Sequence, residues 1–530
     1  MRARSLVCPA RCEFGQTFLP TPLLGSSRGF LKSNWTKPAL ASPISFVQKS
    51  HRWHWPPWAL TLAVLSLVRD GPQAHDLQID FEKTNGVIRA LHGVNSGPLC
   101  YRGTVDLSKF HRELGIPLTR LHDVVWLNAE AVDIHTIFPD FRNDPERPDS
   151  YAFQATDDYI QAIINVGSRI VYRLGESIEH TPHKYQVHPP PDPRKWAAIC
   201  LGIIRHYNEG WAGGYHHNIR YWEIWNEPDV RPAMWTGNDE QYFQLYETAA
   251  KAIKARFPDL KVGGPALGGV GDFKGDAFRP AGFLTNFLAF CAERRVPLDF
   301  FSWHHYTSQP WDLPRRARAV RRILDQAGFA NAESHLNEWN FLPDDDWRPM
   351  LRDGQGAERE QWYRKMGGPA GAAFAACALM LLQDAPLNEA NFYTGEIQGF
   401  GMFDINGVPK TTFYAFKAFR ELLGAPLRVE TLGARNGEVA ALSGTNLDRT
   451  QAALLVSNFK SSDSQFRLSL RHQPWQGRTS FELFLVDGQH HLSPMGNAAA
   501  EPNGAAVSFE LKAPSVLLVK LRPQTEAAPK

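Results

Sequence analysis

The chain has few cysteines, almost no net charge and no long hydrophobic run. Only 6 of its 530 residues are Cys, and their spacing fits neither a zinc site nor a disulfide framework. Lys and Arg total 57 against 55 Asp and Glu, for a net charge of +2. Because this balance attracts no polyanion, we expect no nucleic-acid partner. The main apolar run, residues 58–68, is too short to span a bilayer, so we expect no membrane span.

The same apolar run predicts a targeting signal. It follows Lys49 and Arg52 and precedes Arg69, and Ala74 offers a small residue for cleavage. This order of basic, apolar and small residues is typical of a secretory signal peptide. We therefore expect residues 1–75 to be a leader outside the fold and the protein to be periplasmic or secreted, with a cytoplasmic protein as the alternative.

From about residue 85 the sequence is rich in βα units. Short apolar strands alternate with amphipathic helical segments, a pattern that indicates a parallel sheet. The candidate strands are residues 86–93, 117–122, 168–173, 219–225, 261–265, 298–304, 334–337 and 388–393. Eight is the number that a closed barrel needs. The sequence therefore predicts the α/β class, with a (β/α)8 TIM barrel over residues 85–425.

After about residue 425 the helical period disappears and strands take over. Candidate strands are residues 452–456, 466–470, 481–486, 507–511 and 516–521. Asn-Gly or Asp-Gly pairs at 436–437, 487–488 and 503–504 supply the positive φ angles of tight turns. We predict an accessory antiparallel β-sandwich over residues 426–525, to which residues 76–84 are expected to add a strand.

Two carboxylates end strands of the predicted barrel, where barrel enzymes place their chemistry. The fourth strand ends in Trp-Asn-Glu-Pro at 225–228, and Pro228 is expected to hold Glu227 extended. The seventh strand ends in Glu338, followed by Trp339. Two carboxylates that face each other with aromatic rings beside them predict glycoside cleavage.

Other titratable residues near these strands are expected to be structural. Glu223, Asp299 and Glu333 lie on or beside strands, where ion pairs are the commoner role. His180, His183 and His188 share a proline-rich loop without an acidic ligand at metal-binding spacing. We therefore predict no metal site.

The motifs together resemble a known family. The runs Trp-Asn-Glu-Pro at 225–228, Glu-Trp-Asn at 338–340 and Ser-Trp-His-His-Tyr at 302–306 resemble the clan of retaining glycosidases built on (β/α)8 barrels. Within that clan, Gly-Val-Asn at 93–95, Thr-Arg-Leu-His-Asp at 119–123 and Arg-His-Tyr at 205–207 are most similar to glycoside hydrolase family 39. That family contains β-xylosidases and α-L-iduronidases, built as a barrel with an accessory β-sandwich. The resemblance covers about residues 76–525.

The resemblance implies a role for each site residue. Glu227 would be the general acid/base and Glu338 the nucleophile, while Asn226 would bind the sugar 2-hydroxyl. The other expected sugar-binding residues are His122, His304, Tyr306, Trp339 and Tyr393, of which Tyr306 would touch the nucleophile. Charge on Glu338 is expected to raise the pKa of Glu227. A retaining enzyme would hold the two carboxyl groups about 5 to 5.5 Å apart.

The expected activity is that of a retaining, exo-acting β-xylosidase that releases xylose from xylo-oligosaccharides by double displacement, without a cofactor. A neutral pentose is favoured because the loops after Tyr306 and Trp339 carry no basic pair for a substrate carboxylate, although Arg348 is within reach. An α-L-iduronidase-like or α-L-arabinosidase activity stays open, as does a non-catalytic carbohydrate-binding barrel. The oligomeric state is left open.

Overall fold

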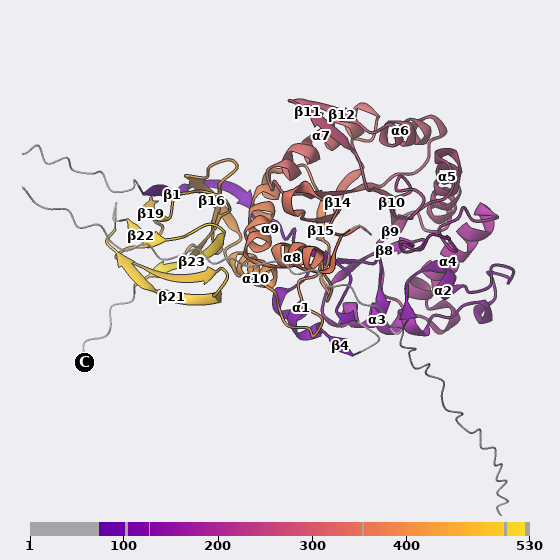
Figure 1. The fold of residues 1–530 in the computed structure, drawn as a ribbon, viewed down its shortest axis with the longest axis horizontal. Coiled ribbons are helices and arrows are strands. Elements are labelled where there is room, and N and C mark those ends of the chain that lie inside the picture. Colours follow the sequence, from indigo (N-terminus) through magenta and orange to yellow (C-terminus); the bar gives the residue numbers. More distant parts are fainter. Residues whose placement is uncertain (1–73, 101–103, 127, 352–353, 503–505, 525–530) are drawn as a thin grey trace, which may run out of the picture. The chain divides into compact units, whose positions relative to one another are not determined.

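Eight parallel strands close into a barrel, as predicted (Figure 1). The computed structural model describes residues 74–100, 104–126, 128–351, 354–502 and 506–524. In their order around the barrel the strands are β10 (Lys261–Leu267), β13 (Phe300–Thr307), β14 (Glu333–Phe341), β15 (Glu389–Phe392), β2 (Gly93–Asn95), β5 (Leu118–Arg120), β8 (Arg169–Leu174) and β9 (Tyr221–Ile224).

Helices follow the strands and form the outer layer (Figure 1). In chain order they are α1 (Ser108–Leu114), α2 (Ile134–Ile137), α3 (Gln154–Asn165), α4 (Pro193–Glu209), α5 (Asp239–Arg256), α6 (Gly282–Arg294), α7 (Asp312–Gln326), α8 (Gly356–Gly367), α9 (Pro369–Leu381) and α10 (Thr411–Leu422). Helix α5 shows why the sequence forms them. Asn238 and Gln241 make a reciprocal capping box at its start. Its buried side chains, such as Tyr246 and Ile253, recur at helical spacing.

The first barrel strand begins later than predicted. Residues 86–93 were expected to form it, but β2 starts at Gly93, and Gly86 and Val87 end strand β1 (His75–Val87) of a second sheet. Gly93 fits the barrel because a Cβ there would lie 2.7 Å from the carbonyl oxygen of Ala390 on β15. The apolar residues Ile88 and Leu91 are buried in the connection rather than in a strand, which explains the misassignment.

The second sheet has nine strands and is antiparallel except where β1 runs parallel to β19. Its order is β21 (His491–Ala500), β20 (Thr479–Val486), β23 (Ser515–Pro523), β18 (Ala452–Asn458), β17 (Val439–Thr445), β16 (Leu427–Leu432), β1, β19 (Gln465–Arg471) and β22 (Val507–Glu510). The predicted tail strands correspond to β18, β19, β20, β22 and β23, whereas β16, β17 and β21 were missed.

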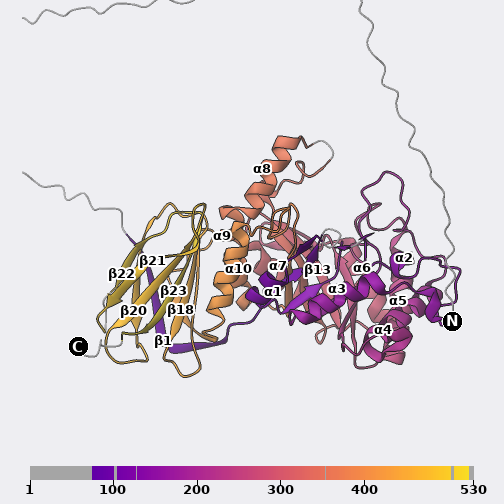
Figure 2. The same ribbon diagram turned by 90° about the horizontal axis from the view of Figure 1, so that it is seen from below.

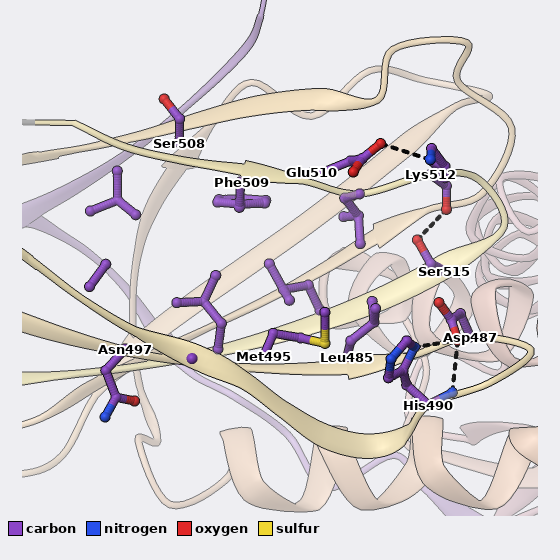
Figure 3. A pocket seen from close by; sticks show the side chains of 16 residues that line it. Leu485, Asp487, His490, Met495, Asn497, Ser508, Phe509, Glu510, Lys512 and Ser515 are labelled. Carbon is purple, nitrogen blue, oxygen red and sulfur yellow. Dashed lines mark hydrogen bonds and ion pairs between the residues drawn. The ribbon is translucent and has the colours of Figure 1, made fainter.

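The two faces of this sheet bury different cores. One face encloses its own apolar cluster, which includes Leu77, Leu454 and Phe466. Leu455 and Leu518 of the other face join the core of the barrel helices instead. Between β20, β21 and β22 the sheet also leaves a cavity of about 480 Å³, which Figure 3 shows from close by. The fold is thus a TIM barrel with an accessory, mostly antiparallel β-sandwich. Figure 2 shows the same elements from a second side.

Two sequence expectations concern termini and thiols. The predicted leader falls almost wholly on residues 1–73, which lie outside the described residues. In the part of the chain that the structure describes, Cys100, Cys200, Cys291 and Cys377 are buried and unpaired. No single helix in that part is long and apolar enough to cross a membrane. The pair Gly356–Gly367 and Pro369–Asp384, bent by 41°, meets the criterion of length and composition only when taken together.

Candidate active site

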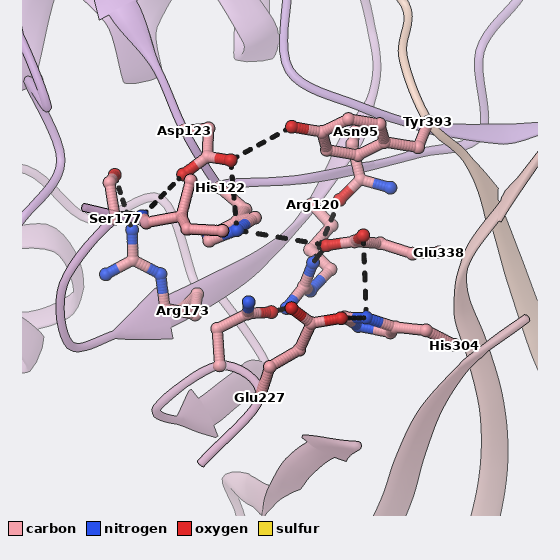
Figure 4. Close-up of polar contacts among 12 residues, drawn as sticks. Asn95, Arg120, His122, Asp123, Arg173, Ser177, Glu227, His304, Glu338 and Tyr393 are labelled. Atoms are coloured by element: carbon pink, nitrogen blue, oxygen red, sulfur yellow. Dashed lines mark hydrogen bonds and ion pairs between the residues drawn. The ribbon is translucent and has the colours of Figure 1, made fainter. Parts of the chain in front are cut away.

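The carboxyl ends of the barrel strands bring Glu227 and Glu338 together (Figure 4). Glu227 follows β9, and Glu338 lies in β14. One oxygen of each carboxylate and one ring nitrogen of His304 all lie within 4.8 Å of one another. Both carboxylates line a cavity of about 780 Å³. The separation matches the short spacing that retaining glycosidases use rather than the 6.5 to 9.5 Å or so of inverting ones.

The backbone of Glu227 is not extended, so that prediction was wrong. Its φ angle is 45°, in the left-handed region that L side chains rarely adopt. Pro228 disfavours the right-handed α region for Glu227, and hydrogen bonds to the neighbouring strands β8 and β10 hold the backbone here. The N–H of Trp225 donates to Leu174 O at 2.7 Å, and that of Glu227 donates to Ala266 O at 3.0 Å. Strain of this kind is typical of functional sites.

Glu338 is surrounded by hydrogen-bond donors. Arg120 Nη1 donates to its Oε1 at 2.8 Å, and the Tyr306 hydroxyl donates to its Oε2 at 2.7 Å. His304 Nδ1 lies 3.4 Å from Oε2. The pKa of Glu338 is raised on balance, because burial outweighs the opposing effects of His304, Arg120 and the Tyr306 hydroxyl. The hydrogen bonds from Arg120 and Tyr306 favour the ionised form and limit this rise.

Glu227 has fewer partners, and its pKa is raised to about 7. Burial is the largest cause and the negative charge of Asp123 the second, while Arg120 opposes the shift. The predicted repulsion between the two glutamates is present as well, and it raises the pKa of Glu338. The Glu227 carboxylate contacts His304 Nδ1 at 2.8 Å. Burial lowers the pKa of His304 to about 4, so its ring is neutral at neutral pH. Glu227 itself gains and loses its proton near pH 7.

Arg120 of β5 donates hydrogen bonds to several residues of the site, and the sequence analysis assigned it no role. Its fully buried guanidinium also donates to Glu223 Oε2 and Asn226 Oδ1, each at 2.6 Å, and to Asn95 Oδ1 at 3.0 Å. Glu223 is thereby an ion-pair partner, as expected from the sequence. The signals for Arg120 were a charged residue inside an apolar strand and its place in the Thr-Arg-Leu-His-Asp motif at 119–123.

The structure gathers most of the predicted sugar-binding residues at the same place. His122, Tyr306 and Tyr393 line the cavity. His304 is buried between the two carboxylates. Asn226 is also buried, and its Nδ2 has no hydrogen-bond partner among the described residues.

Trp339 does not belong to this group, contrary to the prediction. Its ring is fully buried and packs against Phe392 at 5.2 Å and Phe416 at 6.3 Å between centroids. Successive side chains of a strand point to opposite faces. Because Glu338 points into the barrel, Trp339 must point outward to the helices.

Three acidic residues of the cavity, Asp123, Glu130 and Glu396, were not predicted as site residues. Asp123 Oδ2 accepts from the Tyr393 hydroxyl at 2.9 Å, and burial raises the pKa of Asp123. Burial also raises the pKa of Glu396 to about 8. Among the described residues that line the cavity there is no Lys or Arg. Arg348, considered as a partner for an acidic sugar, pairs with Asp346 instead.

Three clusters in the described ranges place His and carboxylate atoms close enough to share a metal ion: Glu227 with His304 and Glu338, Glu130 with Asp133 and His135, and Asp80 with Glu82 and His472. In the first two clusters one carboxylate is already paired with an arginine, Glu338 with Arg120 and Asp133 with Arg173. The arrangement suits proton transfer and nucleophilic attack by the carboxylates themselves.

A closed (β/α)8 barrel with two close carboxylates in a cavity is the architecture of barrel glycoside hydrolases. The chain belongs to the glycosyl hydrolases family 39, whose family model matches residues 69–340.

Known proteins of this kind resemble the chain in sequence and fold. A β-xylosidase of Geobacillus stearothermophilus is 30% identical over 263 residues, which cover 45% of this chain and 48% of that protein. A β-xylosidase of Caldicellulosiruptor saccharolyticus is 26% identical over 367 residues, 61% of this chain and 66% of that protein. The chain thus spans about half the length of the first and about two thirds of the second. The solved structure of a glucosidase from Croceicoccus marinus is similar in fold, with a TM-score of 0.70 and 24% identity, over 86% of this chain and all of that one.

Proposed function

We propose that this protein is a retaining, exo-acting β-xylosidase in which Glu227 is the general acid/base and Glu338 the nucleophile. The observation that carries the proposal is the approach of the two carboxylates to within 4.8 Å in one cavity. Their different surroundings support the division of roles. Hydrogen bonds from Arg120 and the Tyr306 hydroxyl favour the charged form of Glu338, whereas burial and the charge of Asp123 raise the pKa of Glu227 to about 7.

In the first half-reaction, ionised Glu338 attacks the anomeric carbon of the sugar. The bond from that carbon to the leaving oxygen breaks, and protonated Glu227 donates its proton to this oxygen. The product is a xylosyl ester of Glu338 and a free alcohol. Asn226 would orient the sugar through its 2-hydroxyl, for which its unpartnered Nδ2 is a suitable donor.

In the second half-reaction, Glu227 acts as a base. It removes a proton from water, the water oxygen attacks the anomeric carbon, and the ester bond to Glu338 breaks. Formation of the ester removes the charge of Glu338 and makes Glu227 more acidic, so the base is ionised when it is needed. Two inversions give net retention at the anomeric carbon.

A neutral pentose fits the cavity better than a uronic acid. The carboxylates of Asp123, Glu130, Glu227, Glu338 and Glu396 line it, and no Lys or Arg does so in the described part of the chain. A substrate carboxylate would meet like charges without a cation to pair with. Xylose is favoured because the two curated relatives are β-xylosidases.

The test is hydrolysis of 4-nitrophenyl β-xyloside, followed by NMR of the first-formed sugar. Retention predicts that β-xylose appears before mutarotation. Glu338→Gly should be inactive alone and should form α-xylosyl azide when azide is added, because azide takes the place of the missing carboxylate. Glu333→Gln is the matched control, since Glu333 lies on the same strand but pairs with Lys261 and His335. Release of α-xylose first, or an active Glu338→Gly without azide, would contradict the proposal.

A further inference from the structure

The barrel cavity has a second wall that the proposed chemistry does not use. Apolar side chains line it beside the carboxylates: Val125, Val230, Trp347, Met350 and Ile405. Three of them are exposed to an unusual degree for apolar residues, with Val125 at 39%, Trp347 at 37% and Ile405 at 63%. Exposed apolar side chains that gather around one cavity mark a binding surface.

This wall is continuous with the reacting groups. The Tyr306 ring, whose hydroxyl donates to Glu338, meets the Trp347 ring nearly edge-on at 5.1 Å. Phe400 lies 6.2 Å from Tyr306 and 6.3 Å from Trp347 between ring centroids. An apolar surface therefore runs from a direct neighbour of the carboxylate out to solvent.

Several polar groups of the same cavity already have partners within the protein. Gln398 Nε2 donates to Glu396 Oε1 at 2.6 Å. Glu130 lies 3.2 Å from His135 Nε2 and forms an ion pair with that ring. A second sugar at the mouth would lose hydration of its hydroxyls and find few partners in return. An apolar group would instead bury area at no such cost.

The volume of the cavity leaves room for more than one sugar ring. At about 780 Å³ it falls in the range that holds a drug-sized ligand. With the anomeric carbon between Glu227 and Glu338, the sugar occupies the buried end, and the leaving group must extend along the exposed end past Trp347 and Ile405.

We infer that the leaving-group site takes an apolar aglycone, an aromatic or alkyl alcohol, in preference to a further xylose unit. The inference rests on the proposed function, because it needs the sugar to lie between the two carboxylates. It assigns Trp347, Met350 and Ile405 to substrate selection.

A series of alkyl β-xylosides tests the inference, because methyl, butyl and hexyl xylosides have leaving groups of nearly the same chemistry. We expect kcat/KM to rise at least tenfold from the methyl to the hexyl compound, and the hexyl compound to exceed xylobiose. A flat series, or xylobiose cleaved more efficiently than hexyl xyloside, would overturn the inference.

Two variants test which side chains cause the dependence of kcat/KM on alkyl-chain length. In Trp347→Ala and Ile405→Ser the ratio of kcat/KM for hexyl to methyl xyloside should fall at least fivefold. Ile405 is largely exposed, so its variant keeps the test valid if loss of the Trp347 ring disturbs the aromatic wall. Leu447→Ala removes an equally apolar side chain that is 77% exposed and follows β17 of the second sheet, and its ratio should not change.

Different results would contradict the proposed function and the inferred aglycone site. If no xyloside of any length is hydrolysed, the proposed function is wrong and the inference falls with it. If all the xylosides are hydrolysed with retention but the hexyl-to-methyl ratio of kcat/KM is unchanged in Trp347→Ala and Ile405→Ser, only the inferred aglycone site is wrong.

Discussion

Two cavities of this molecule share apolar walls and acidic side chains but differ in how those acids are held. In the sheet cavity of Figure 3, Glu510 pairs with Lys512 at 2.8 Å and Asp487 with His490 at 2.9 Å. Burial is the largest single influence and raises the pKa of Asp487, but the N–H groups of Gln489 and His490 together with the His490 side chain outweigh it, and the net shift is downward. In the barrel cavity of Figure 4, burial raises the pKa of Glu227 to about 7.

The difference shows what makes a cavity chemically active. Carboxylates near the surface that already have a dedicated partner have a structural role. Carboxylates buried together with too few donors take up protons near neutral pH, which is what acid and base catalysis needs. Each of the following variants alters the barrel site, and a matched variant in the sheet cavity serves as its control.

The largest effect is expected for Glu338→Gln. Loss of the nucleophile should lower kcat on the order of 10⁵-fold, as for nucleophiles of other covalent enzymes. Glu510→Gln in the sheet cavity should change kcat less than twofold. Steady-state kinetics with 4-nitrophenyl β-xyloside measures both, and comparable losses in the two variants would remove the distinction between the cavities.

Glu227→Ala should have the next largest effect, and it should depend on the leaving group. For hexyl β-xyloside, whose alkoxide needs a proton, kcat/KM should fall by about 10² to 10⁴. For a dinitrophenyl xyloside, which leaves without a proton, the fall should be much smaller. Asp487→Ala is the reference in the sheet cavity and should affect neither substrate. Equal losses on both substrates would contradict the role of Glu227.

A stability difference is expected from Arg120. Arg120→Met leaves the buried carboxylates of Glu223 and Glu338 without their cation and should lower the free energy of unfolding by about 3 to 5 kcal/mol. Lys512→Met removes the cation of an exposed pair and should leave the unfolding free energy unchanged within error. Urea denaturation followed by fluorescence compares them. If both variants lost a similar free energy of unfolding, burial would not distinguish the Arg120 network from the exposed Glu510–Lys512 pair.

These residues also show which features of the fold and the site can be predicted from the sequence. The barrel and both carboxylates could be predicted, because apolar strands repeat and the acids stand where strands end. The outward direction of Trp339 follows from strand alternation once Glu338 is assigned to the interior. The partners of Arg120 could not be predicted, since they lie on other strands of the barrel, with Glu338 218 positions away. Strand β21 was missed because most of its side chains are exposed and it is defined by its pairing with β20.

The smallest effect is expected in the pH profile of Asp123→Asn. The negative charge of Asp123 raises the pKa of Glu227, so removing that charge should lower this pKa. Glu227 must be protonated in the first half-reaction, and the alkaline limb of kcat/KM, expected near pH 7, should therefore move to lower pH by roughly half a unit to one unit. The acidic limb, which depends on ionised Glu338, should move less. Asp487→Asn should move neither limb. An alkaline limb that stays in place, or that moves to higher pH, would mean that the charge of Asp123 does not reach Glu227 and that burial alone tunes the acid.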